Sequence, residues 1–168
     1  MTTRKSIWAL FGILVISAWV LGSAIQASAE TLNYKFYTWP IKGENVPVAD
    51  VELHSVGLFT RGAFYVFENG EVATVDIVVT GDFIKGLGPF MQYVNIKFQD
   101  SSTIMIKSQG EFGGTTGQWK SEIIKGTGRF VGIKGTQSAK AKYLPPEKGE
   151  PGPKGYGEGT ITYTLPSK

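Results

Sequence analysis

The stretch GAFYVFENGEVATVDIVVTGDF, residues 62–83, decides the fold class of this chain. In its second half, positions 73, 75, 77 and 79 are Ala, Val, Ile and Val, whereas Thr74, Asp76 and Thr80 lie on the opposite face. This alternation with a period of two predicts a strand with one buried face. Asn69-Gly70 separates it from a second apolar run, and this dipeptide is the strongest short hairpin signal. The stretch therefore predicts an antiparallel β-hairpin.

The same pattern continues outward in both directions. Short β-rich runs bounded by glycine, proline, asparagine or aspartate are typical of strands. The predicted strands span Leu32–Trp39, Val51–Gly57, Gly62–Phe67, Val72–Phe83, Phe90–Gln99, Thr103–Ser108, Gln118–Ile124, Gly135–Tyr143 and Gly159–Leu165. No segment after residue 30 has a sustained helical period. Successive strands without helices predict an antiparallel barrel or sandwich, and closure removes exposed sheet edges. We expect one all-β antiparallel barrel of about eight strands.

Proline and glycine interrupt this pattern near the C-terminus. The segment Leu144–Gly159 contains a few Gly-x-y triplets, which are too few for a collagen triple helix. We expect a long loop there, either mobile or acting as a lid.

The first 29 residues have the composition of a signal peptide. Arg4 and Lys5 precede the apolar run Ile7–Gly22, and residues 27–29 are Ala-Ser-Ala, a small-residue cleavage signature. An uncleaved anchor is the alternative, but the run falls short of the ~20 residues that span a bilayer. We expect cleavage between Ala29 and Glu30, a barrel over residues 30–168, and a secreted or periplasmic protein without membrane association after cleavage.

Charge and composition exclude several function classes. The whole chain has 17 basic and 14 acidic residues, one histidine and no cysteine. Two of the basic residues and none of the acidic ones lie in the predicted signal peptide, so 15 basic and 14 acidic residues remain in the mature chain. A chain with so little net charge gives no electrostatic reason to expect nucleic-acid binding. The absence of cysteine excludes disulfides, thiol catalysis and cysteine-bound metals. No acidic loop has calcium-site spacing either. We expect no metal and no cofactor.

Motifs for covalent or phosphate chemistry are weak. The chain has no Gly-x-Ser-x-Gly elbow, and His54 is its only imidazole. His54 lies in a predicted strand and is interpreted as a hydrogen-bonded structural residue, although its pKa range keeps it eligible for acid–base work. Gly126-Thr127-Gly128 is interpreted as a β-turn rather than a phosphate loop, because no helix follows it.

A binding cavity is the functional interpretation that remains. Aromatic residues occur on most of the predicted strands, and a barrel of about eight strands can hold one small ligand. The alternative is that these rings fill the core. The candidate ligand-binding residues are Tyr34, Tyr65, Tyr93, Trp119 and Tyr163. Asp76 is the candidate catalytic carboxylate, since a carboxylate facing the interior would have a raised pKa. Alternation alone leaves open which strand face is inside.

The segment KGTGRFVGIKG, residues 125–135, resembles the Gly-Thr-Gly-Lys/Arg-Phe turn of dirigent proteins and is similar to the corresponding turn of allene oxide cyclases. Weaker matches follow the dirigent order: Phe36-Tyr37 with Gly43 and Asn45, Val56-Gly57 and Gly62 with Tyr65-Val66, and Ser102-Thr103-Ile104. In this resemblance Phe130 plugs one end of the barrel.

The resemblance implies an eight-stranded, calycin-like barrel with a central hydrophobic pocket, often assembled as a trimer. In those families the pocket steers coupling or cyclisation of a reactive small molecule by positioning, without a cofactor. Dirigent proteins commonly have His-Asp where this chain has Trp39 and Pro40, so their pocket acid is not carried over.

Two hypotheses follow. The first is an exported barrel that binds a hydrophobic small molecule and steers its cyclisation or isomerisation. The second is a non-catalytic envelope or secreted interaction protein whose barrel is filled by side chains. The sequence leaves open whether the protein is an enzyme.

Overall fold

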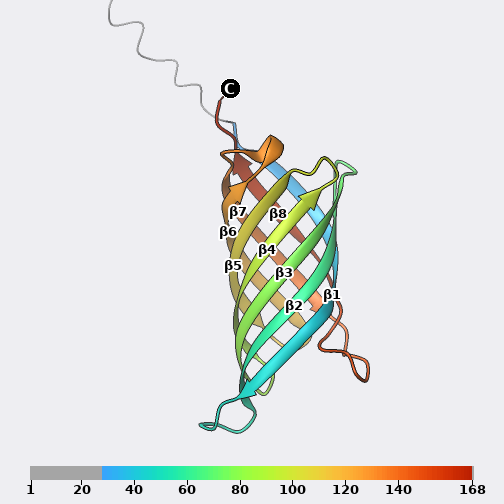
Figure 1. Ribbon diagram of the computed structural model, residues 1–168, viewed down its shortest axis with the longest axis vertical. Helices are drawn as coiled ribbons and strands as arrows, with labels where there is room; N and C mark the ends of the chain where they lie inside the picture. Colours follow the sequence, from blue (N-terminus) through green and yellow to red (C-terminus); the bar gives the residue numbers. More distant parts are fainter. Residues whose placement is uncertain (1–27, 168) are drawn as a thin grey trace, which may run out of the picture.

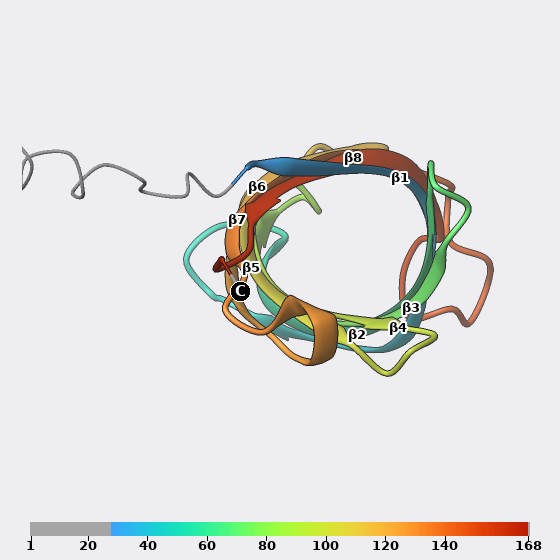
Figure 2. The same cartoon turned by 90° about the horizontal axis from the view of Figure 1, so that it is seen from above.

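A computed structural model describes residues 28–167, and they form one closed antiparallel barrel. Residues 1–27 of the predicted signal peptide lie outside the described residues, and its cleavage stays a prediction. Figure 1 shows the elongated barrel from the side, and Figure 2 shows its closed ring from one end. The strands are β1 Glu30–Pro47, β2 His54–Phe67, β3 Val72–Ile84, β4 Gly88–Phe98, β5 Thr103–Phe112, β6 Thr116–Gly126, β7 Lys134–Tyr143 and β8 Gly155–Thr164, with a short 3₁₀ helix, η1, at Gly128–Phe130.

Every strand pairs with the next one along the chain, and β8 closes the ring against β1. The hairpin predicted around Asn69-Gly70 is confirmed, because Val66 pairs with Val72 across the turn. Gly70 has φ +83°, a left-handed conformation that glycine adopts without strain. The all-β barrel predicted from alternation is therefore the observed fold.

The two strands predicted over 51–57 and 62–67 are wrong as separate elements. Residues 48–53 form a loop, and β2 then runs unbroken from His54 to Phe67. Gly57 and Gly62, which resembled strand breaks, lie inside β2 under aromatic rings. A Cβ would lie 2.3 Å from the Phe59 ring at Gly57 and 2.6 Å from the Trp39 ring at Gly62. These glycines make room for packing and do not end a strand.

Other strand boundaries also differ from the prediction, and two of them change the shape of a connection or strand markedly. The first strand extends to Pro47, with a register shift between Pro40 and Lys42 that accommodates the proline. The long C-terminal loop is shorter than predicted, because β8 begins at Gly155 and leaves residues 144–154 as the connection.

The alternation of buried and exposed residues matches the sequence pattern. Along β3, positions 73, 75, 77 and 79 face the interior, and the residues between them face solvent. The same holds for β4, where Val94, Ile96 and Phe98 are buried, and for β8, where Ile161 and Tyr163 are buried. One apolar interior therefore runs the length of the barrel.

The two ends of the barrel carry different connections. We call the end formed by residues 68–71, 99–102 and 127–133 the closed end; it also carries the start of β1 and the end of β8. We call the end formed by residues 48–53, 85–87, 113–115 and 144–154 the mouth end. In Figure 1 the closed end is at the top, where η1 is the orange coil.

Candidate ligand-binding cavity

Aromatic packing seals the closed end. Phe130, carried inward by η1, is only 3% exposed. Its ring lies 4.9 Å from Phe98 and 6.0 Å from Tyr163 between centroids. The turn that aims it begins with Gly128 at φ +59°, where a Cβ would collide with Ser102. The plug expected from the Gly-Thr-Gly segment is confirmed as a buried ring.

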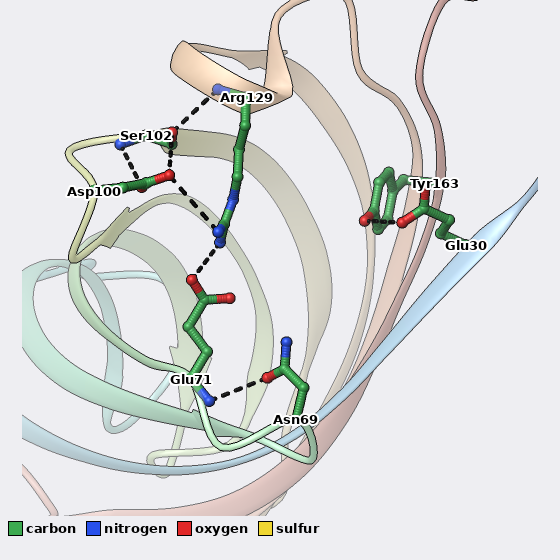
Figure 3. A network of polar contacts seen from close by, with 7 residues as sticks. All are labelled: Glu30, Asn69, Glu71, Asp100, Ser102, Arg129 and Tyr163. Atoms are coloured by element: carbon green, nitrogen blue, oxygen red, sulfur yellow. Dashed lines mark hydrogen bonds and ion pairs between the residues drawn. The ribbon is translucent and has the colours of Figure 1, made fainter.

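Figure 3 shows the polar network that ties the closed end together. The Arg129 guanidinium lies 2.5 Å from the Glu71 carboxylate and 3.6 Å from the Asp100 carboxylate. It also lies 4.8 Å from the ring centroids of Phe98 and Phe130, within cation–π range. One arginine therefore links the β2–β3 turn, the β4–β5 turn and η1, with its charge balanced by carboxylates.

The remaining polar groups of this end also pair with one another. Asp100 accepts hydrogen bonds from the backbone N–H (2.9 Å) and the hydroxyl (3.0 Å) of Ser102. The backbone N–H bond is the main cause that holds the pKa of Asp100 below its usual value. Tyr163 donates to Glu30 at 2.6 Å, which joins β8 to the start of β1.

A buried polar belt crosses the middle of the barrel. The Tyr34 and Tyr65 rings stack with centroids 4.3 Å apart, and Gln137 donates to the Tyr34 hydroxyl. Gln137 in turn accepts from Ser121 at 2.6 Å, and the Ser121 hydroxyl lies 2.8 Å from that of Ser108. Burial raises the pKa of both tyrosines, so their hydroxyls stay protonated.

A cavity of about 270 Å³ lies between this belt and the mouth-end loops. That volume is near the lower end of the roughly 300–1,000 Å³ range of small-molecule sites. Its walls are mainly apolar and include the aromatic residues Phe59, Phe83, Phe90, Phe112, Trp119 and Tyr143. Gly86 and residues 151–153 also line it, so the cavity reaches the mouth-end loops.

Arg61 is the one charged residue among those that line the cavity. Its Nη2 donates to the Pro153 carbonyl at 2.7 Å, and its Nε donates to the Thr38 hydroxyl at 3.3 Å. Its guanidinium carbon lies 5.7 Å from the centroid of the Tyr143 ring. Burial lowers the pKa of Arg61 from its usual value, yet a guanidinium stays charged in proteins. Arg61 therefore presents a positive charge among aromatic walls.

Trp119 supplies a second polar group to the lining. It is 7% exposed and packs against Phe36 and Phe90, with ring centroids 5.8 and 6.0 Å away. Its indole Nε1–H is buried and has no hydrogen-bond partner among the described residues. Native proteins rarely leave a buried donor unpaired.

Four of the predicted site residues lie inside the barrel. Tyr65 and Trp119 line the cavity. Tyr34 belongs to the polar belt, and Tyr163 lies at the closed end beside Phe130. Ligand binding by Tyr34, Tyr65, Trp119 and Tyr163 stays a prediction, and Tyr34 and Tyr163 lie outside the lining of the mouth-end cavity.

The other two predicted site residues face outward. Tyr93 is 44% exposed on the outer face of β4. Asp76 lies on the outer face of β3 and pairs with Lys97 at 2.5 Å, with 64% of its side chain exposed. The parity of β3 places Val75 and Ile77 inside and the carboxylate between them outside. We therefore remove Asp76 and Tyr93 from the candidate site.

Arg61 and Phe59 are among the cavity residues that were not predicted from the sequence. Both share the inward parity of Tyr65 on β2, so counting back in steps of two from Tyr65 reaches them. Because Gly62 was interpreted as the start of a strand, the inward-facing positions before it were not identified.

His54 lies at the start of β2, outside the cavity lining, and joins two segments of the mouth end. Its Nδ1 lies 2.5 Å from Asp50 in the β1–β2 loop, and its Nε2 lies 2.6 Å from Asp82 on β3. The hydrogen bond with Asp50, and then that with Asp82, raises the pKa of His54. This arrangement matches the hydrogen-bonded structural role expected for it.

The described residues provide neither a metal site nor a membrane-spanning helix. Residues 28–167 contain no group of three histidine, aspartate or glutamate side chains placed to hold a metal ion. Within the same residues, no helix is long and apolar enough to span a membrane.

Comparison with known proteins identifies the fold. No family model and no curated protein sequence matches the chain. The pterocarpan synthase dirigent protein GePTS1 superposes with a TM-score of 0.54 at 14% identity, over 88% of this chain and 94% of that one. The pterocarpan synthase dirigent protein PsPTS1 gives 0.53 at 14% identity, over 84% and 99%. A protein of unknown function from the DUF3224 family of Shewanella oneidensis MR-1 gives 0.55 at 12% identity, over 84% and 100%.

These identities are low, so the likeness extends to the fold alone. The chain has a dirigent-like barrel. The similarity to allene oxide cyclases stays a prediction from the sequence.

Proposed function

We propose that this barrel binds a small apolar molecule in its mouth-end cavity and restricts it to one conformation. The observation that carries the proposal is the aromatic cavity of about 270 Å³ in a barrel whose other half is packed. The dirigent-like fold supports it, because two of the similar structures are described as pterocarpan synthases.

The cavity's chemistry favours positioning over acid–base catalysis by a carboxylate. No aspartate or glutamate lines it in the described part of the chain. Trp39 and Pro40, which replace the dirigent His-Asp pair, lie on the outer face beside Phe64 and at the bulge of β1. The groups available to a ligand are aromatic rings, the protonated Tyr65 hydroxyl and a few neutral polar groups, with Arg61 as the one cation. Enclosure by such walls can steer a cyclisation or isomerisation through conformational restriction.

The signal-peptide-like N-terminus supports the further proposal that the barrel works outside the cytoplasm, in the periplasm or secreted.

For its partner we propose further copies of this chain, as a homotrimer. An aromatic cluster on the outer face supports this: Trp39 lies 6.0 Å from Tyr37 and 5.2 Å from Phe64, and the latter two are 43% and 46% exposed. Native mass spectrometry of the purified protein measures the assembly, and a monomer at micromolar concentration would contradict the trimer.

A calorimetric titration with 2-naphthylmethanol, a small neutral aromatic probe, tests the binding proposal. We compare the wild type with Val79→Phe, which adds a ring inside the cavity, and with the matched control Val78→Phe, which adds the same ring on the outer face. We expect saturable binding by the wild type and the control, and a loss of about tenfold or more in Val79→Phe, corresponding to ~1.4 kcal/mol.

Absence of binding to the wild type, or equal binding by both variants, would contradict the proposal. A wild-type barrel that binds nothing would instead agree with the filled, non-catalytic barrel.

A further inference from the structure

The two arginines of the described barrel walls and ends differ in how their charge is balanced. Arg129 at the closed end has Glu71 and Asp100 beside it. Arg61, in the cavity, forms no ion pair with any described carboxylate, and its two hydrogen bonds go to neutral oxygens of Thr38 and Pro153. Buried charges in proteins are usually paired, because desolvation of an isolated charge is costly.

Arg61 also has donors to spare. A guanidinium carries five N–H groups, and the contacts made by Nε and Nη2 leave those of Nη1 without a protein acceptor. An N–H group of Nη1 can therefore donate to a carboxylate oxygen, and such charge-assisted hydrogen bonds are stronger than those between neutral groups.

The indole of Trp119 is a second unpaired donor on a residue that lines the cavity. Its buried N–H faces no protein acceptor, although Trp119 lines the cavity. An unmet buried donor costs free energy, so an acceptor atom supplied by a ligand would be favoured there.

The remaining residues that line the cavity also favour a ligand that is aromatic and anionic. The other polar side chains, among them Thr38, Asn45, Ser55 and Gln92, are neutral, and no acidic residue is present to repel an anion. The aromatic walls favour a flat apolar body, and about 270 Å³ restricts it to one or two rings.

We propose that the ligand of this cavity is an aromatic carboxylic acid in its anionic form, whose carboxylate binds Arg61 while Trp119 donates to an oxygen of the same molecule. This inference rests on the proposed function, and it names the substrate class of that site.

Two probes that share one ring system test the inference. 2-Naphthoate carries the carboxylate, and 2-naphthylmethanol replaces it with a neutral hydroxyl group. We expect calorimetry at neutral pH to give at least about tenfold tighter binding of 2-naphthoate to the wild-type protein, in line with a charge-assisted pair. This comparison requires no variant, so it remains valid if a substitution at Arg61 fails to fold.

Substitutions then test whether Arg61 causes the preference for 2-naphthoate. Arg61→Gln should abolish the preference, so that the variant binds 2-naphthoate and the alcohol with affinities within about twofold of each other, while Arg61→Lys should keep part of the preference because it keeps the charge. The matched control is Lys120→Gln, which removes one positive charge from the outer face of β6 beside Trp119. It should change neither affinity. Trp119→Phe, which keeps a ring and removes the N–H, should weaken 2-naphthoate binding severalfold.

The outcomes separate the two proposals. Equal affinity of the wild type for both probes would overturn the acid preference and leave the proposed function standing. Failure of both probes to bind would overturn both. A preference that persists in a folded Arg61→Gln protein would show that another group binds the carboxylate, and would overturn the assignment.

Discussion

Both ends of this barrel contain phenylalanine side chains, but the closed end is filled and the mouth end contains a cavity. At the closed end, Phe67 and Phe98 stack with centroids 5.4 Å apart, and Phe130 covers them from η1. At the mouth end, Phe83 meets Phe59 and Phe112 edge-on, at 6.2 Å in each case. The first arrangement fills the lumen, whereas the second leaves the cavity. Aromatic content alone therefore does not say whether a barrel is filled.

The connections explain much of this difference. The 3₁₀ turn after β6 places a ring into the lumen, with its arginine neutralised by two carboxylates. The β7–β8 connection at the mouth end contributes backbone and prolines, and it is held through the Pro153 carbonyl by Arg61. One end is closed by a side chain, and the other is bordered by a loop.

The largest expected effect is at the plug. Phe130→Ala should destabilise the protein by about 3–5 kcal/mol, because it leaves a void in packed surroundings. Chemical denaturation measures this loss. The neighbouring Val131, 65% exposed, gives the matched control Val131→Ala, which should change stability by about 0.5 kcal/mol or less. A loss under about 1 kcal/mol in Phe130→Ala would mean that the closed end is not sealed by this ring.

A pair of substitutions on β3 compares the two halves directly. Val75, which is 2% exposed and does not line the cavity, and Val79, which does line it, share one face of the strand. Val75→Phe should cost about 1–3 kcal/mol by overpacking, and Val79→Phe should cost about 1 kcal/mol or less because its ring enters open space. Urea denaturation of both variants measures the difference. Equal losses would show that the two halves are packed alike.

The histidine at the mouth end predicts a pH dependence with a definite sign. The folded protein raises the pKa of His54, so its contribution to stability is complete below its unfolded pKa of about 6.5 and is lost as pH rises through the folded value. The pKa of Asp50 is lowered mainly by its bond with His54, so the same pair weakens again as pH falls through that value.

An NMR titration of the His54 ring measures the first shift. The stability difference between wild type and His54→Gln should shrink from neutral to alkaline pH. A ring pKa at or below about 6.5 would contradict the two carboxylate contacts.

The smallest effect is expected at Asp76. Exposed ion pairs contribute about 0–1 kcal/mol, so Asp76→Asn should barely alter stability, and it should leave binding of 2-naphthylmethanol unchanged. The Lys97→Gln variant, which removes the other partner of the pair, serves as the comparison. Weaker binding in Asp76→Asn alone would return this carboxylate to the site.

The sequence predicted the barrel better than it predicted the cavity. The alternation along β3 and the Asn69-Gly70 turn are local signals, and both proved correct. The buried position of Phe130 was also expected, from the resemblance of its glycine turn to that of dirigent proteins. The cavity depends on rings from β1 through β7 that meet across the lumen, and no local sequence pattern shows how closely such rings pack.

The most consequential miss was Arg61, which lies one residue before Gly62. Glycine in a strand can mark either a break or the close approach of an aromatic ring, and only the observed packing of Trp39 over Gly62 decides between them. The outward placement of Asp76 followed from parity once the apolar face of β3 was known to be the inner one.

The central claim is that the open half of this barrel holds a small apolar molecule. A crystal structure of the barrel soaked with 6-bromo-2-naphthylmethanol tests it most directly, since anomalous scattering locates the bromine. We predict one strong bromine peak inside the barrel, between Val79 and Trp119 on the mouth side of the polar belt. Bromine confined to the outer surface, or absent from the interior at saturating probe, would contradict the account.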